Sequence, residues 1–178
     1  MLPDADNRSL ERYIEASKLW CRKQRDLYRP LASPLSLNEK TIYGSFFPEE
    51  VIEEARFVQL NEGLESPQAD PGSPIKFSLS AMMAFTFVDT VVETPLMPRS
   101  EAAIRRVRFH ELVHVTQVRA FGEDAVVEQY LRSWSRAGYN YWEIPFEAQA
   151  RNLERAFMKD PTGAFSVDKI VRDNAVSQ

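Results

Sequence analysis

Residues 108–117 read Arg108-Phe109-His110-Glu111-Leu112-Val113-His114-Val115-Thr116-Gln117. This stretch holds both histidines of the 178-residue chain, His110 and His114, and Glu111 directly follows the first of them. Two histidines placed at random in a chain of this length would fall four residues apart only about once in ninety trials. Chance is therefore a poor explanation of the H-E-x-x-H pattern.

The spacing of the two histidines has a physical reading on an α-helix. Residues i and i+4 share one helix face and lie about 6 Å apart at Cβ, so both imidazoles can reach one ion. Glu111 lies about 100° round the helix from His110, where it is better placed to hydrogen-bond a metal-bound water than to join the ligands. The alternative is a helix that carries two histidines on a polar face. Phe109 and Leu112 argue against it, because they make the helix apolar over most of its circumference, and buried imidazoles need a partner charge.

The composition is that of a globular chain, with 44% hydrophobic and 27% charged residues. This length predicts one domain with its own core. The net charge of −4 and the pI of about 5.3 argue against a nucleic-acid or anionic-membrane partner. The single cysteine, Cys21, excludes an internal disulfide. Without a leader-like N-terminus or an apolar run of about 20 residues, we expect no membrane insertion and a cytoplasmic location, although export without a cleaved signal would leave no trace.

Hydrophobic periodicity predicts a helix-rich α+β fold. Helices are expected at about 9–28, 48–54, 101–120, 124–137, 145–159 and 167–176. Strands are expected at 57–60, 75–79 and 85–92. Loops are expected at 29–48 and 61–74, and the first of them is expected to wrap on the core. We expect a small, mostly antiparallel sheet packed on the histidine helix. The single domain 1–178 would comprise an N-terminal helix and wrapping loop (1–54), a core (55–160) and a C-terminal helix (161–178).

A metal held for catalysis usually has three protein ligands and one open position. The chain has no third histidine and no nearby cysteine, so a carboxylate has to complete the site. The downstream acids are Glu123, Asp124, Glu128, Glu143, Glu147 and Glu154. Glu147 is the best of them, because it begins a helix with an apolar stripe that includes Phe146 and Ala150, and it borders that inward face. Glu143 is the second choice. The alternative for Glu147 is a solvated first-turn glutamate favoured by the helix dipole.

The sequence HELVHVTQ, followed 33 residues after His114 by Glu147 in the context IPFEAQA, resembles the gluzincin class of zinc metallopeptidases. It looks most like the minimal gluzincins and the peptidase-like domain associated with extracellular contractile injection systems. In such domains a short sheet, whose edge strand binds extended peptide, precedes the H-E-x-x-H helix, and a later E-x-x-A helix contributes the glutamate. Residues 147–150 match that form. The resemblance covers about Ala55 to Glu154 and is specific at the metal motif, while residues 1–54 match nothing.

The resemblance implies Zn²⁺ bound by His110, His114 and Glu147, with Glu111 as the general base. The predicted function is a zinc metallopeptidase acting on peptide or protein substrates, in which the metal activates a water, Glu111 removes its proton and the hydroxide attacks the peptide carbonyl. Two other functions fit the same residues. One is a non-catalytic, zinc-stabilised domain that binds peptide without cutting it, and the other is a metal-dependent hydrolase of a small amide.

Weaker assignments concern the surroundings of the metal. Tyr139, Tyr141 and Arg151 are candidates to stabilise the oxyanion, with packing or surface pairing as the alternative for each. Gln117 is a candidate to orient a metal ligand without binding the metal itself. The strand at 85–92 is the candidate peptide-binding edge, with an ordinary inner strand as the alternative. The N-terminal helix and the 29–48 loop could lie over the groove as an inhibitory segment.

Overall fold

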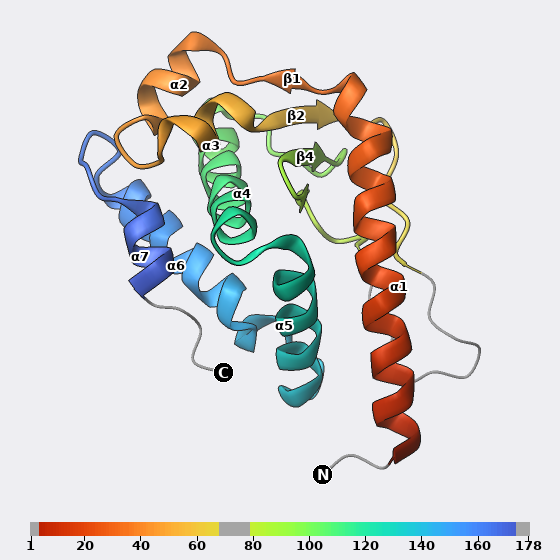
Figure 1. Cartoon of the computed structure of the whole chain (residues 1–178). Coiled ribbons are helices and arrows are strands. Elements are labelled where there is room, and N and C mark those ends of the chain that lie inside the picture. Colours follow the sequence, from red (N-terminus) through yellow and green to blue (C-terminus); the bar gives the residue numbers. More distant parts are fainter. Residues whose placement is uncertain (1–3, 68–78, 174–178) are drawn as a thin grey trace.

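The structure is a computed structural model that describes residues 4–67 and 79–173 (Figure 1). Its helices are α1 (Asp4–Tyr28), α2 (Leu37–Tyr43), α3 (Glu49–Glu54), α4 (Glu101–Phe121), α5 (Glu123–Arg136), α6 (Pro145–Lys159) and α7 (Val167–Asp173). Its strands are β1 (Ser33–Pro34), β2 (Arg56–Gln59), β3 (Ala84–Phe87) and β4 (Thr90–Glu93), and two 3₁₀ turns are η1 (Arg29–Leu31) and η2 (Tyr141–Glu143). The predicted helix-rich α+β class is confirmed. Among the described residues no helix has the length and apolarity needed to cross a membrane.

Helix α4 is the central element, and it packs against α6, α7, β3 and α5. It begins after Ser100 and ends at Gly122, where φ is 85°, a value that glycine adopts without strain. Phe109 is fully buried and stacks on Phe157 of α6, with ring centroids 4.3 Å apart. Consecutive helical residues point about 100° apart, so the burial of Phe109 in this aromatic core fixes the direction of His110.

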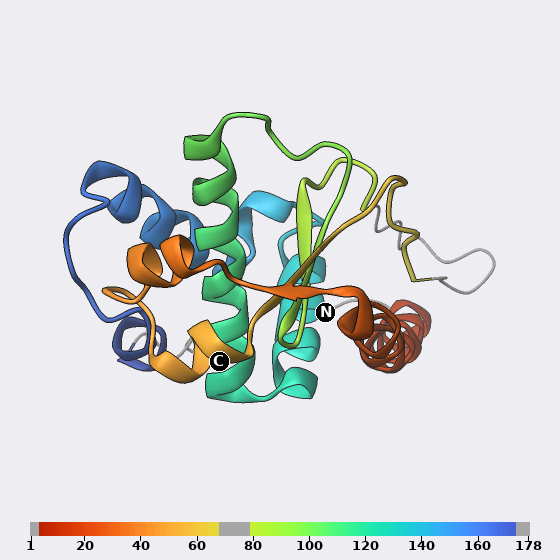
Figure 2. The same cartoon turned by 90° about the horizontal axis from the view of Figure 1, so that it is seen from above.

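The sheet has the strand order β1-β2-β4-β3. Strands β1 and β2 are antiparallel, β2 and β4 are parallel, and β3 and β4 form an antiparallel hairpin, so the sheet is mixed with two antiparallel pairings out of three. Figure 2 shows the sheet between α4 and α1. Within the described sheet β3 lies at an edge and also contacts α4. A strand edge is therefore available beside the histidine helix.

Two predicted segments differ from the structure. Residues 85–92 are not one strand: they form most of β3 and β4, which reverse at Val88, where φ is 59°. Residues 29–48 are not a plain loop, because they contain η1, β1 and α2. Helix α2 is started by a capping box, in which the Ser36 side chain accepts from the Glu39 backbone and the Glu39 carboxylate accepts from the Ser36 backbone. The strand predicted at 75–79 falls outside the described residues except for Leu79, which is not in a strand.

Helix α1 lies beside α5 and is joined to it by ion pairs (Figure 1). These pairs run along the two antiparallel helices and join Glu11 to Arg132, Lys18 to Glu128, and Arg22 to Asp124. At its C-terminal end α1 is also tied to the β3–β4 turn, where Arg25 donates to Asp89. The ion pairs flank an apolar contact in which Leu10 and Ile14 pack with Leu131 and Trp134 of α5, while Cys21, one turn or more further along α1, packs with the hairpin.

The Asp89 contacts give a prediction about stability. Asp89 accepts two hydrogen bonds from Arg25, at 3.1 and 3.0 Å, and lies 3.0 Å from Arg29 Nη1. Burial alone would raise the pKa of Asp89, but the hydrogen bonds from Arg25 and Thr90 and the charge of Arg29 hold it below its ordinary value of 3.8. A carboxyl whose pKa falls on folding stabilises the fold above its unfolded pKa, and this contribution is lost as pH falls through the folded pKa.

We therefore expect Asp89→Asn to lower the free energy of unfolding by about 1–2 kcal/mol at pH 7. The difference from the wild-type chain should shrink as pH falls below about 4. Urea unfolding of both proteins at pH 7 and pH 3 measures the two differences. Equal differences at the two pH values would contradict the assignment of the stabilisation to the ionised carboxylate.

Candidate metal centre

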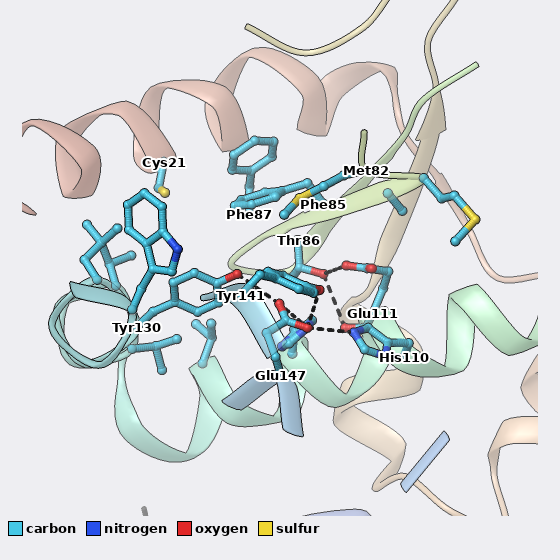
Figure 3. Close-up of a pocket in the computed structure, with 18 of the residues that line it drawn as sticks. Cys21, Met82, Phe85, Thr86, Phe87, His110, Glu111, Tyr130, Tyr141 and Glu147 are labelled. Carbon is cyan, nitrogen blue, oxygen red and sulfur yellow. Dashed lines mark hydrogen bonds and ion pairs between the residues drawn. The ribbon is translucent and has the colours of Figure 1, made fainter. Parts of the chain in front are cut away.

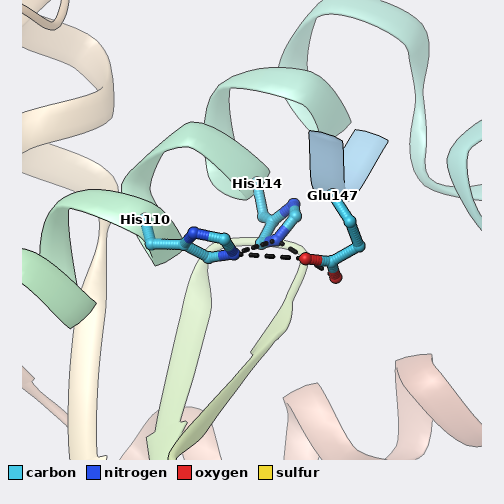
Figure 4. Close-up of side chains that lie close together, drawn as sticks. All are labelled: His110, His114 and Glu147. Carbon is cyan, nitrogen blue, oxygen red and sulfur yellow. Dashed lines mark hydrogen bonds and ion pairs between the residues drawn. The ribbon is translucent and has the colours of Figure 1, made fainter. Parts of the chain in front are cut away.

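Helices α4 and α6 bring His110, His114 and Glu147 together (Figure 4). His110 Nε2 lies 3.1 Å from His114 Nε2 and 3.3 Å from Glu147 Oε2, and His114 Nε2 lies 3.5 Å from Glu147 Oε1. One potential ligand atom from each residue falls within 4.8 Å of the others. This is a cluster that could hold a metal ion.

Glu147 faces inward because of its place in α6. Pro145 starts the helix, and Phe146, Ala150 and Leu153 bury its apolar stripe against the core. Glu147 borders this stripe and is only 5% exposed, so it is not the solvated first-turn glutamate of the alternative interpretation. Glu143, the second choice, is exposed and accepts a hydrogen bond from Asn140 instead.

The outer ring nitrogens of both histidines are held by polar side chains. His110 Nδ1 lies 2.9 Å from Glu154 Oε2, and His114 Nδ1 lies 2.8 Å from Gln117 Oε1. The Gln117 amide nitrogen donates to the Phe146 carbonyl and to Gln149, which leaves its oxygen to accept from His114. When the two rings are neutral, as metal binding requires, these contacts assign the remaining proton to Nδ1, so that both Nε2 lone pairs face the cluster.

The electrostatics of the cluster favour a positive charge at its centre. Burial alone would lower the pKa of His110, but hydrogen bonds to Glu147 and Glu154 raise it to about 10. The pKa of His114 is also raised, because the charge of Glu147 outweighs burial. Burial would raise the pKa of Glu147, yet the two imidazoles hold it well below its usual range. A divalent cation supplies the kind of charge for which these groups are arranged.

Glu111 lies beside the cluster, on the next face of α4. It is 6% exposed, and its Oε2 accepts a hydrogen bond of 2.7 Å from Thr86 Oγ1 on β3 (Figure 3). Glu111 lines the same cavity as His110 and His114, and its charge contributes to the raised pKa of both. Glu111 is not one of the three clustered residues, and this agrees with the expectation that it would lie next to the metal ligands.

Two tyrosines bind the carboxylate of Glu147. Tyr130 of α5 donates to Oε1 at 3.0 Å, and Tyr141 of η2 donates to Oε2 at 2.5 Å (Figure 3). Burial and the charge of Glu147 raise the pKa of both phenols, so each keeps its proton and acts as a donor. These contacts hold Glu147 against the two imidazoles.

The three candidates for oxyanion stabilisation are placed differently. Tyr141 contacts Glu147 directly, and Arg151 Nη1 lies 3.8 Å from Glu147 Oε2. The guanidinium of Arg151 also lies 5.0 Å from the centroid of the Trp142 ring, and it donates to the Trp142 carbonyl. Tyr139 packs edge-on against Trp134, with ring centroids 4.8 Å apart, and lines the same cavity as the cluster.

The contacts of Tyr130 and Glu154 with the cluster were not predicted from the sequence. No sequence pattern distinguishes a tyrosine that donates a hydrogen bond to a metal ligand from one that packs in the core. Glu154 carried a usable signal, because it follows Glu147 by seven residues and therefore shares its helix face two turns later. A search for a second acid on the face of Glu147 would have found it.

A cavity of about 840 Å³ lies beside the cluster, and residues of α1, β3, α4, α5 and α6 line it (Figure 3). His110, His114, Glu111 and Glu147 all contribute to its wall. Comparisons of the chain with known protein families, with curated proteins and with solved structures find no match.

Proposed function

We propose that the protein is a zinc metallopeptidase of the gluzincin kind, which hydrolyses peptide bonds at the cluster of His110, His114 and Glu147. The single observation that carries the proposal is the convergence of two Nε2 atoms and a carboxylate, with Glu111 turned toward the same cavity. Two imidazoles, one carboxylate and one open position form a typical ligand set of catalytic zinc. The donor set and the charges of the site fit this ion.

When bound, zinc would polarise the substrate carbonyl and make a nearby water more acidic. Glu111 takes the proton of the attacking water and passes it to the leaving amine. Thr86 holds one oxygen of this carboxylate and so sets its direction. Arg151 carries a donor beside the cluster, Nη1, that can stabilise the negative charge developing on the carbonyl oxygen, whereas the single proton of Tyr141 is already donated to Glu147.

The edge strand β3 supports a peptide as the substrate. An extended peptide can add to an exposed sheet edge through main-chain hydrogen bonds. Thr86 lies on β3 and its side chain contacts Glu111, so a peptide that follows this strand passes the general base. The strand is thus the part of the structure best placed to present a scissile bond.

Cleavage of a mixed peptide library tests the proposed function. We expect the zinc-loaded protein to cleave the library, to lose this activity after chelation and dialysis, and to regain it when Zn²⁺ is added back. Stoichiometric zinc without any cleavage would favour the non-catalytic peptide-binding domain. Cleavage that survives complete removal of metal would contradict the mechanism.

A further inference from the structure

The cavity beside the metal centre extends well beyond it. Its remote walls are formed by apolar side chains of β3 and α5, and we call this part the α1–α5 chamber. The wall residues used in the argument are Phe85, Phe87, Val126, Val127, Leu131 and Trp134. Ligand pockets typically measure about 300–1,000 Å³ and are mostly apolar with a few polar groups. The size and lining of the cavity fit a pocket for part of a substrate.

Tyr130 connects the chamber to the metal centre. Its hydroxyl donates to Glu147 Oε1, and its ring packs with the apolar cluster that contains Leu131 and Trp134. Figure 3 shows Cys21, Phe87 and Tyr130 around the space, with Glu147 and His110 beside it. A side chain that enters the chamber would therefore belong to a residue close to the metal.

Helix α1 supplies a polar stripe to this apolar space. Tyr13, Ser17 and Cys21 follow one another at four-residue intervals, so they lie on one helix face, and all three line the cavity. Tyr13 is 3% exposed and Ser17 is 4% exposed. The Tyr13 and Ser17 hydroxyls lie near each other, and no other described residue makes a hydrogen bond with either of them.

Buried hydroxyls normally have hydrogen-bond partners, because leaving them without one costs free energy. Two such hydroxyls side by side in an otherwise apolar wall mark the place where a polar atom of a bound molecule would lie. Glu123 also lines the cavity, and burial raises its pKa, but its carboxylate is already paired with Arg22, whose Nε lies 3.5 Å from Oε2. The chamber therefore does not require a cationic ligand.

We propose that the α1–α5 chamber is the specificity pocket of the enzyme and that it receives a tyrosine side chain next to the scissile bond. The apolar walls surround the aromatic ring, and the tyrosine hydroxyl bonds to Tyr13 and Ser17. This inference rests on the proposed peptidase function for its substrate class. It assigns a substrate-binding role to α1, a helix outside the part of the chain that resembles a metallopeptidase.

Binding without turnover tests the pocket separately from hydrolysis. The probe is a series of fluorescently labelled peptides, identical except for alanine, phenylalanine, tyrosine or lysine at one position, tested at each side of the cleavable bond. Zinc-loaded Glu111→Gln protein serves as the background, and fluorescence anisotropy gives the Kd values. We expect the tyrosine peptide to bind at least about 10-fold more tightly than the alanine peptide and more tightly than the phenylalanine peptide. Tightest binding of the lysine peptide would overturn the proposal in favour of a basic side chain read by Glu123.

Substitutions on α1 locate the effect. Ser17→Leu fills the chamber and should reduce binding of the tyrosine peptide to the level of the alanine peptide. Ala16→Leu makes a similar change at an exposed position of the same helix and should leave all Kd values unchanged. Circular dichroism and thermal melting establish that each variant folds. If Ser17→Leu fails to fold, Val127→Phe replaces it in the same measurement, because the larger side chain fills the chamber from the opposite wall.

The outcomes separate the two proposals. Selective binding of the tyrosine peptide without cleavage by the wild-type protein would sustain the pocket and reject the peptidase. Cleavage combined with equal Kd values for all four peptides would reject the pocket and keep the peptidase proposal. The same conclusion would follow if the Ser17→Leu variant lost affinity equally for every peptide.

Discussion

Replacing Glu111 with glutamine is expected to lower kcat by about 10²- to 10⁴-fold and to leave the metal bound, which is the usual contribution of a general acid–base group. The substitution keeps the shape of the side chain and an oxygen that can accept from Thr86. It removes only the capacity to take up a proton. Glu111 is not one of the three clustered residues, so metal content measured by elemental analysis should stay at the wild-type value.

Glu143→Gln is the matched control for this variant. Glu143 is an exposed glutamate near α6 that accepts from Asn140, and its loss should leave both kcat and metal content unchanged. An unchanged kcat in Glu111→Gln would remove Glu111 from the mechanism. Loss of metal in the same variant would mean that Glu111 is a ligand instead of a base.

Replacing Glu147 with glutamine should produce the largest loss of metal affinity. The substitution removes the anionic member of the cluster and keeps the shape of the side chain, with an amide oxygen that accepts from one of Tyr130 and Tyr141 and an amide nitrogen that donates to the other hydroxyl. Loss of an outer-shell partner typically weakens metal binding by 10- to 100-fold, and loss of a ligand should exceed about 100-fold. Competition with a fluorescent zinc chelator measures the affinity. Thermal melting provides a second readout, because zinc should raise the Tm of the wild-type chain and not that of the variant.

Glu154→Gln distinguishes a ligand from a supporting residue. Glu154 binds Nδ1 of His110, on the side of the ring that faces away from the cluster. Its loss should reduce zinc affinity by about 10- to 100-fold, because the ring orientation is weakened while the ligands remain. A larger loss in Glu154→Gln than in Glu147→Gln would exchange the roles of the two glutamates.

The parts of the site that could be predicted from the sequence are those that depend on local geometry. The i, i+4 spacing of His110 and His114 requires only that α4 be a helix, and the apolar residues around them make that helix strongly periodic. Glu147 could be chosen because Pro145 and the stripe of Phe146 and Ala150 define the start of α6 and its inward face. These features follow from neighbours within a few residues along the chain.

The parts that could not be predicted depend on contacts between distant segments. The chain reverses at Val88, where φ is 59°. Because β-branched residues avoid this conformation, a valine at this position does not indicate a turn. The position of α1 over the cavity depends on its pairing with α5, a segment about one hundred residues away. Helix α2 is different, because the Ser36–Glu39 capping box that starts it is a local feature of residues 29–48, the segment predicted to be a loop.

X-ray absorption spectroscopy of the zinc-loaded protein reports the atoms bound to the metal, and so it tests whether His110, His114 and Glu147 hold zinc. We predict one zinc per chain, with two imidazole nitrogens at about 2.0–2.1 Å and the remaining ligands oxygen. The scattering from two imidazole rings should fall to that of one in His114→Ala. A chain that binds no stoichiometric zinc, or a zinc shell without histidine nitrogens, would contradict the account.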